Sequence, residues 1–136
     1  MKFVSVRGHL RNGQINIQLD RPHRCFVALA EFYLPSIEDR NGRENNVDIY
    51  CDQIDSSFDN PNRLLKRLIF NHNRSHQFYN CFEAKWFDFK QLDSQDKFLT
   101  LRIKRTNGKT MIFKSDSEIF LTLVFKTDTD DKWIHI

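Results

Sequence analysis

The feature that most constrains this fold is a repeated alternation of apolar and polar residues in short segments. Residues 14–19, 97–104 and 118–126 each place an apolar side chain at every second position. A period of two puts successive side chains on opposite faces of a strand, so each segment has one face for a core and one for water. Several such segments separated by turn signals predict an all-β antiparallel sandwich or barrel.

Other segments extend the pattern to about eight to ten strands. Asn12-Gly13 and Asn107-Gly108 favour tight turns, because both residue types tolerate a positive φ. Residues 63–70 also have helical spacing, and we favour a strand there because the run is short. The expected strands lie at 2–7, 14–19, 25–34, 47–52, 63–70, 97–104, 109–113, 118–126 and 133–136. The aromatic-rich residues 77–82 and 85–89 fit either short strands or a packed loop.

Residues 25–34 are almost continuously apolar, which is typical of a strand covered on both faces. We expect its drier face to carry every second residue from Phe26 to Phe32. Glu31 is the one charged residue in this run. We expect it to be hydrogen bonded or at a rim, in preference to a catalytic role.

Composition indicates a single domain covering residues 1–136. A chain of this length buries roughly two-thirds of the surface that its unfolded form exposes, and 13 Phe residues provide large apolar side chains for a two-sheet core. The 21 basic and 18 acidic residues give a net charge of +3. That balance permits contact with nucleic acid and does not require it.

The cysteines and the N-terminus predict an intracellular origin. Cys25, Cys51 and Cys81 are odd in number and form no Cys-x-x-Cys pair, so we expect a reducing compartment and no disulfide framework. We also expect no signal peptide for secretion, because residues 1–7 lack a long apolar stretch. No apolar run is long enough for a membrane helix, so a membrane is not among the expected partners.

We expect no catalytic residues, no metal and no cofactor, and therefore no enzyme. Phosphate-binding loops and nucleophile elbows are missing from the sequence. Groups that could be imagined as metal ligands or acid–base pairs are more simply surface residues. They are His72 and His76 with Cys81, Asp52 with Asp55, Glu38 with Asp39, and the acidic turn of Asp128, Asp130 and Asp131.

Two sets of residues are candidates for binding. Basic residues lie among apolar ones at Arg63, Lys66, Arg67 and Arg74, with aromatic residues following. Such a set can bind single-stranded nucleic acid by charge and stacking, although an outward basic face of a strand explains it more simply. The second set is a pair of aromatic residues, for which a place in the core is an equal alternative: Tyr79 and Trp86.

Several of these segments, taken in order, resemble one family. The chain is similar to a shortened member of the penton-like minor capsid proteins of Polinton (Maverick) elements and adintovirus-type viruses. Tyr50-Cys51-Asp52 is the most distinctive part of the match, and residues 36–46 replace a longer segment of the family. The matching stretches are 18–23, 26–35, 47–55, 64–70, 98–104 and 119–125.

The resemblance implies a single jelly roll of about eight strands, with two four-stranded sheets and two Greek keys. It implies a structural virion protein that assembles with itself, as a pentamer, at capsid vertices beside the major capsid protein. The protein would pass through the host cytoplasm or nucleus before assembly. The basic residues near 63–74 would then face the capsid interior and meet packaged nucleic acid without sequence specificity.

Two alternatives remain open from the sequence. One is a small β-sandwich that binds carbohydrate or another protein through its loops, with Tyr79, Trp86 and the 36–46 loop as candidates. The other is a non-specific binder of single-stranded nucleic acid that uses Arg63, Lys66 and Arg67.

Overall fold

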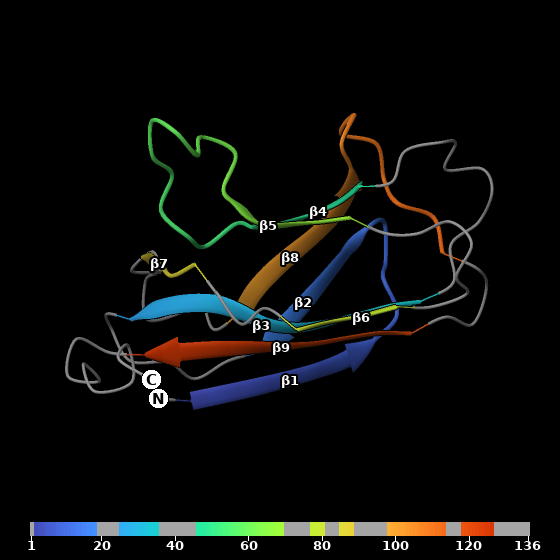
Figure 1. Cartoon of the computed structure of the whole chain (residues 1–136), viewed down its shortest axis with the longest axis horizontal. Coiled ribbons are helices and arrows are strands. Elements are labelled where there is room, and N and C mark those ends of the chain that lie inside the picture. Colours follow the sequence, from blue (N-terminus) through green and yellow to red (C-terminus); the bar gives the residue numbers. More distant parts are fainter. Residues whose placement is uncertain are drawn as a thin grey trace.

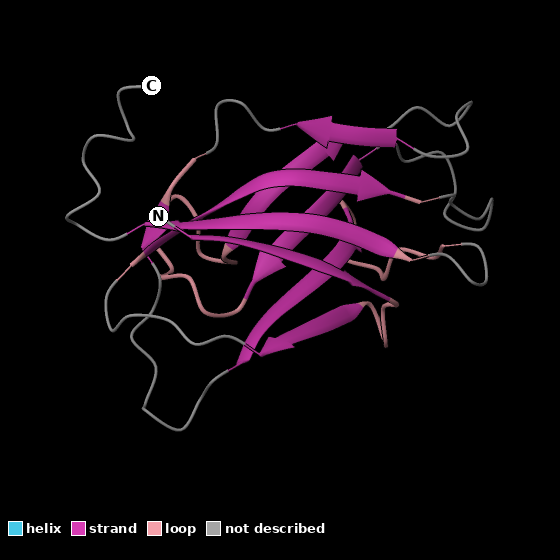
Figure 2. Ribbon diagram, turned by 90° about the horizontal axis from the view of Figure 1, so that it is seen from below, coloured by secondary structure: helices cyan, strands magenta, loops and turns pink. Residues whose placement is uncertain are grey.

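A computed structural model shows an antiparallel β protein (Figure 1). Strands and loops make up the described residues, and Figure 2 shows no helix among them. The described residues are 2–18, 25–35, 46–69, 77–80, 85–88, 98–113 and 118–126. The strands are β1 (Lys2–Gly8), β2 (Gln14–Gln18), β3 (Phe26–Leu34), β4 (Asn46–Cys51), β5 (Leu64–Ile69), β6 (Gln77–Asn80), β7 (Phe87–Asp88), β8 (Phe98–Arg105) and β9 (Ile119–Lys126).

The strands form two sheets that stack face to face (Figures 1 and 2). Sheet A has the order β1-β9-β3-β6, with β7 also paired to β3. Sheet B has the order β2-β8-β4-β5. The predicted all-β antiparallel sandwich is therefore confirmed.

The pairing of strands is nested along the chain. β1 pairs with β9, β2 with β8, β3 with β6, and β4 with β5. Two further pairings, β3 with β9 and β4 with β8, complete the sheets. Each strand from β1 to β4 thus pairs with a strand that follows β4 in the chain, and consecutive strands change sheets until β4 meets β5.

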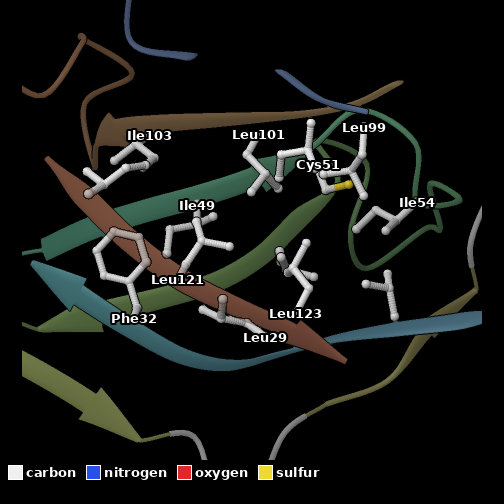
Figure 3. Close-up of a cluster of buried hydrophobic side chains, with 14 of the residues drawn as sticks. Leu29, Phe32, Ile49, Cys51, Ile54, Leu99, Leu101, Ile103, Leu121 and Leu123 are labelled. Carbon is white, nitrogen blue, oxygen red and sulfur yellow. The ribbon is translucent and has the colours of Figure 1, made fainter. Parts of the chain in front are cut away.

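The core lies between the sheets (Figure 3). From sheet A, Phe32 on β3 and Leu121 on β9 are fully buried, and they meet Ile49 on β4 and Leu101 on β8 from sheet B. Alternating residues of β4, β8 and β9 supply these contacts, as the period of two predicts. Ile54 closes one end of the core from the loop after β4.

The expected drier face of β3 is wrong from Phe26 up to the bulge and correct at Phe32. The pairing with β9 shifts register between Leu29 and Glu31, so Ala30 is an extra residue in a β-bulge. Alternation places Val27 and Leu29 in the core before the bulge, and Phe32 and Leu34 after it. A strict period of two over the whole run assigned the core to the opposite face at the start of the strand. It gave the correct side only from Phe32 onward.

Both Asn-Gly dipeptides form tight turns. Asn12 and Gly13 have φ of 54° and 74°, and Arg11 and Gln14 exchange two backbone hydrogen bonds across them. A Cβ at position 13 would lie 2.7 Å from Cγ2 of Thr110. This turn leads from sheet A to sheet B, because β1 and β2 pair with other strands. The turn at Gly108 closes only one bridge, Lys104 to Thr110, and residues 109–113 form no strand.

Several smaller expectations are confirmed. Residues 64–69 form a strand, as favoured over a helix. The side chains of Cys25 and Cys51 are buried in the core like small apolar residues. Glu31 accepts a hydrogen bond from the hydroxyl of Thr122 at 3.3 Å. The predicted end strand at 133–136 lies outside the described residues, and so does the 36–46 loop except for Asn46, which begins β4.

Replacing Phe32 by Ala tests the core directly. Phe32 is fully buried, so its truncation should lower the free energy of unfolding by about 3–5 kcal/mol. The matched control is Phe78→Ala on β6, where the ring is 57% exposed, with an expected change of about 0.5 kcal/mol or less. Urea unfolding monitored by circular dichroism measures both. Equal effects of the two changes would contradict the placement of the core.

Candidate interaction surface

The outer face of sheet B is a network of paired polar side chains. Its outward positions come from alternate residues of β2, β8, β4 and β5, which the strand registers bring into rows. One row joins Gln14, Arg102 and Tyr50, and the next joins Lys104, Asp48 and Arg67. Charged residues on this face therefore lie beside residues of opposite charge.

Asp48 is the most deeply placed charge on this face. It is completely buried, and its carboxylate accepts hydrogen bonds from Nε and Nη2 of Arg67 at 2.7 and 3.0 Å. The hydroxyl of Tyr50 also donates to it at 3.3 Å. These bonds raise the pKa of the Arg67 guanidinium, and burial together with the Asp48 carboxylate raises the pKa of Tyr50. At neutral pH the Arg67 guanidinium therefore stays charged and the Tyr50 hydroxyl keeps the proton that it donates.

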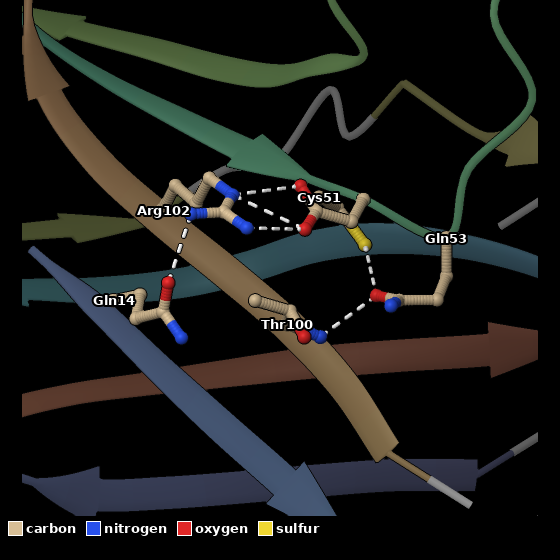
Figure 4. Close-up of polar contacts among 6 residues, drawn as sticks. Gln14, Cys51, Gln53, Thr100 and Arg102 are labelled. Atoms are coloured by element: carbon tan, nitrogen blue, oxygen red, sulfur yellow. Dashed lines mark hydrogen bonds and ion pairs between the residues drawn. The ribbon is translucent and has the colours of Figure 1, made fainter. Parts of the chain in front are cut away.

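A second cluster lies where β4 ends (Figure 4). Arg102 on β8 binds the carboxylate of Asp52 through Nε and Nη2, at 2.9 to 3.1 Å. Nη1 of the same guanidinium donates to the side chain of Gln14 on β2 at 2.8 Å. The hydrogen bonds to Asp52 raise the pKa of Arg102. One side chain thus ties β2 and β8 to the first residue after β4.

Gln53 extends this group of hydrogen bonds into the loop that follows β4 (Figure 4). Its side-chain oxygen accepts from the backbone N–H of Thr100 at 2.7 Å and from the Cys51 thiol at 3.9 Å. The backbone N–H of Asp52 donates to the Thr100 carbonyl at 3.1 Å. Gln53 is buried. Its side-chain oxygen pairs with the backbone N–H of Thr100 on β8, which lies beyond the end of β4 and would otherwise lack a partner from that strand.

The segment from Asp52 to Arg63, which we call the β4–β5 loop, is held by its own hydrogen bonds. Ser57 and Asn60 exchange two backbone hydrogen bonds, at 3.1 and 3.3 Å. The amide of Asn60 binds both the N–H and the carbonyl of Leu64, at 2.9 and 3.0 Å. Arg63 takes a positive φ of 61° and donates from Nε to the Ile54 carbonyl at 3.0 Å. The loop is therefore fixed at both ends and across its tip.

This rigid loop presents one aromatic side chain to solvent. Phe58 lies between Ser57 and Asn60 and is fully exposed, at 104% of the reference area. The Ser57 hydroxyl donates to Asp59 at 2.8 Å, and this hydrogen bond lowers the pKa of Asp59. A fixed loop that leaves a whole Phe ring in water is a candidate contact for another molecule, because rings held in place lose little entropy on binding.

The structure does not gather the predicted basic residues into one patch. Arg67 is engaged with Asp48, and Arg63 with the Ile54 carbonyl. Lys66 stands opposite Ile49, while Arg67 stands opposite Asp48, so these neighbours project from opposite faces of β5. Arg74 lies outside the described residues. Contact of these residues with nucleic acid stays a prediction.

The two aromatic candidates both make contacts within the fold. Tyr79 on β6 packs against the core and its hydroxyl donates to the carbonyl of Ile69 on β5, which links the edges of the two sheets. Trp86 is half-buried, with Nζ of Lys126 4.5 Å from its ring centroid. Neither ring is a freely displayed side chain like Phe58.

The remaining candidates of the sequence give no assembled site in the described part of the chain. Asp52 is bound by Arg102, whereas Asp55 is exposed and its N–H donates to the Asp88 carbonyl. Within that part, no three His, Cys, Asp or Glu residues are placed to hold a metal ion. The candidates that lie outside it are His72, His76, Cys81, Glu38, Asp39, Asp128, Asp130 and Asp131.

Sequence reasoning missed Phe58. The available signal was a single large apolar residue inside Ser56-Ser57-Phe58-Asp59-Asn60-Pro61, a run of residues typical of turns. The alternation of apolar and polar residues could not place Phe58 inside or outside the core, because Phe58 does not belong to a strand.

Comparisons with protein-family models, with curated proteins and with solved structures give no match for this chain. A membrane-spanning candidate is also not found, since the residues described form no helix of the needed length and apolar character.

The two carboxylates of sheet B should differ in their contribution to stability. Asp48→Ala removes a fully buried acceptor of three hydrogen bonds, and we expect a loss of about 1–3 kcal/mol. Asp52→Ala breaks a pair whose side chains are 40% and 38% exposed, so solvent screening limits the loss to about 0.5–1 kcal/mol. Thermal unfolding at neutral pH measures both. A larger effect at Asp52 would contradict the assigned burial.

Proposed function

We propose that the chain is a single jelly roll and acts as a structural virion protein, a penton-like minor capsid subunit that assembles with copies of itself. The nested strand pairing supports the jelly roll, since such a fold is a long antiparallel hairpin rolled into two four-stranded sheets. The resemblance of the Tyr50-Cys51-Asp52 strand and its neighbours supports the capsid role. The proposed assembly is a pentamer at capsid vertices, in contact with the major capsid protein.

The observation that carries self-assembly is the position of exposed apolar side chains. Phe3, Ile69 and Phe78 are 57%, 67% and 57% exposed, and they lie on β1, β5 and β6, which are edge strands of the two sheets. Large exposed apolar side chains on a soluble surface mark sites of protein contact. Neighbouring subunits that meet along these edges would cover them.

The outer face of sheet B fits the same proposal. Its charges are satisfied within the chain, through Asp48 with Arg67 and Asp52 with Arg102. A face of internally paired charges offers shape and solubility, and we assign it no catalytic role. Contact of the basic residues with packaged nucleic acid would be non-specific and would weaken with added salt.

Light scattering of the purified protein over a range of protein and salt concentrations tests the proposal. We expect one closed assembly with the mass of five copies of the 16.4 kDa chain. Because apolar edges supply the contact, the assembly should persist at high salt. A monomer at all concentrations would contradict the proposal. A complex with nucleic acid that disappears at moderate salt would favour a nucleic-acid binder.

A further inference from the structure

Phe58 has the properties of an anchor for a specific contact. Its ring is fully exposed, and the hydrogen bonds of the β4–β5 loop hold it in place. Residues that dominate protein interfaces are large side chains that enter a pocket on the partner with little loss of freedom. Asp55 and Asp59 belong to the same loop and are also exposed, so the loop that carries Phe58 has an acidic rim.

Several other aromatic rings of the chain have a cation beside them. Arg7 lies 5.5 Å from the ring centroid of Phe120, and Lys85 lies 5.3 Å from that of Phe87. Lys126 lies 5.5 Å from the centroid of Phe26. Among the described residues no cation lies over Phe58. A partner that supplies one would complete the pattern, because cations are attracted to the face of an aromatic ring.

A cavity at the β1–β2 turn offers such a cation. Its volume is about 310 Å³ and its lining residues are His9, Arg11, Gln14, Ile15 and Asn16. This volume is at the small end of the usual range for binding pockets and suits one aromatic side chain. Glu118 lies 3.7 Å from His9 and 4.0 Å from Arg7. His9 and Arg7 are therefore engaged with Glu118, and Arg11 is the exposed charge among the lining residues.

The anchor and the cavity belong to opposite edges of sheet B. The β4–β5 loop joins the strands at one edge, and β2 forms the other edge. In Figure 1 the loop extends past the end of β4, away from the β1–β2 turn. One copy therefore cannot fill its own cavity, but a second copy placed beside it can. When each copy uses one patch to contact a different patch on the next copy, the copies form a closed ring if the rotation between them closes.

We propose that Phe58 of one copy enters the cavity lined by Arg11 and Ile15 in the next copy, with Asp55 facing Arg11. This inference rests on the proposed self-assembly and names a further contact between neighbouring copies, in addition to the apolar edges. The ring packs on Ile15 and beneath the Arg11 guanidinium, and the acidic rim meets the basic one. The contact repeats in one direction around a closed assembly.

Light scattering and sedimentation of single and paired variants test this contact. Phe58→Ala should weaken assembly roughly thirty-fold, the size expected for truncating an interface anchor. Phe98→Ala, at a ring on β8 that is 52% exposed and belongs to neither the edge contacts nor this one, is the matched control with a smaller effect. Asp55→Lys and Arg11→Glu should each weaken assembly, and their combination should restore it. Unchanged melting temperatures show that each variant folds.

Each outcome decides a separate question. A monomeric wild-type protein would overturn the proposed function and this contact with it. A wild-type assembly that Phe58→Ala leaves intact would overturn only the contact. Loss of assembly with Phe58→Ala and no restoration in the Asp55→Lys/Arg11→Glu pair would overturn the cavity as the partner of the ring. Weakening by each single change, with restoration in the pair, supports the proposal.

Discussion

The pairing of the first strand with the last is the constraint on which the rest of the structure depends. β9 lies between β1 and β3, and all its residues except Phe120 are buried. Ser5 and Thr122 hydrogen bond across this pairing at 3.1 Å, although they are 117 positions apart. Thr122 gives its own proton to Glu31, so a polar row crosses from β1 to β3. Closing this pair fixes sheet A, and the nested order then places β2 beside β8 and β4 beside β5.

The second sheet depends on paired charges as much as on its core. Asp48 and Asp52 each bind an arginine from a neighbouring strand, so the outer face of sheet B is joined from β2 to β5. The same contacts fix the start of the β4–β5 loop. There the side chain of Gln53, in place of the backbone of β4, accepts the hydrogen bond from the Thr100 N–H of β8. The surface of the sheet and the rigidity of the loop therefore have one physical origin. A loop held in this way can present Phe58 without disturbing the core.

Much of the fold could be predicted from the sequence, because local alternation depends only on neighbouring residues. It correctly identified β4, β8 and β9 as strands, and Asn12-Gly13 as a turn. The bulge at Ala30 could not be predicted, since it comes from the register against β9, far along the chain. Pairing of Arg67 with Asp48 depends on register in the same way, and it determines how much positive charge the candidate basic residues display.

The most direct test of this account is a disulfide between β1 and β9. Ser5→Cys with Thr122→Cys should oxidise within one chain, because the two side chains are in contact. Arg7→Cys with Gln18→Cys is the control, since these residues would face each other if β1 and β2 continued the Asn12-Gly13 turn as a hairpin. Peptide mapping should find the 5–122 bond and no 7–18 bond. A 7–18 bond without the 5–122 bond would contradict the nested sandwich.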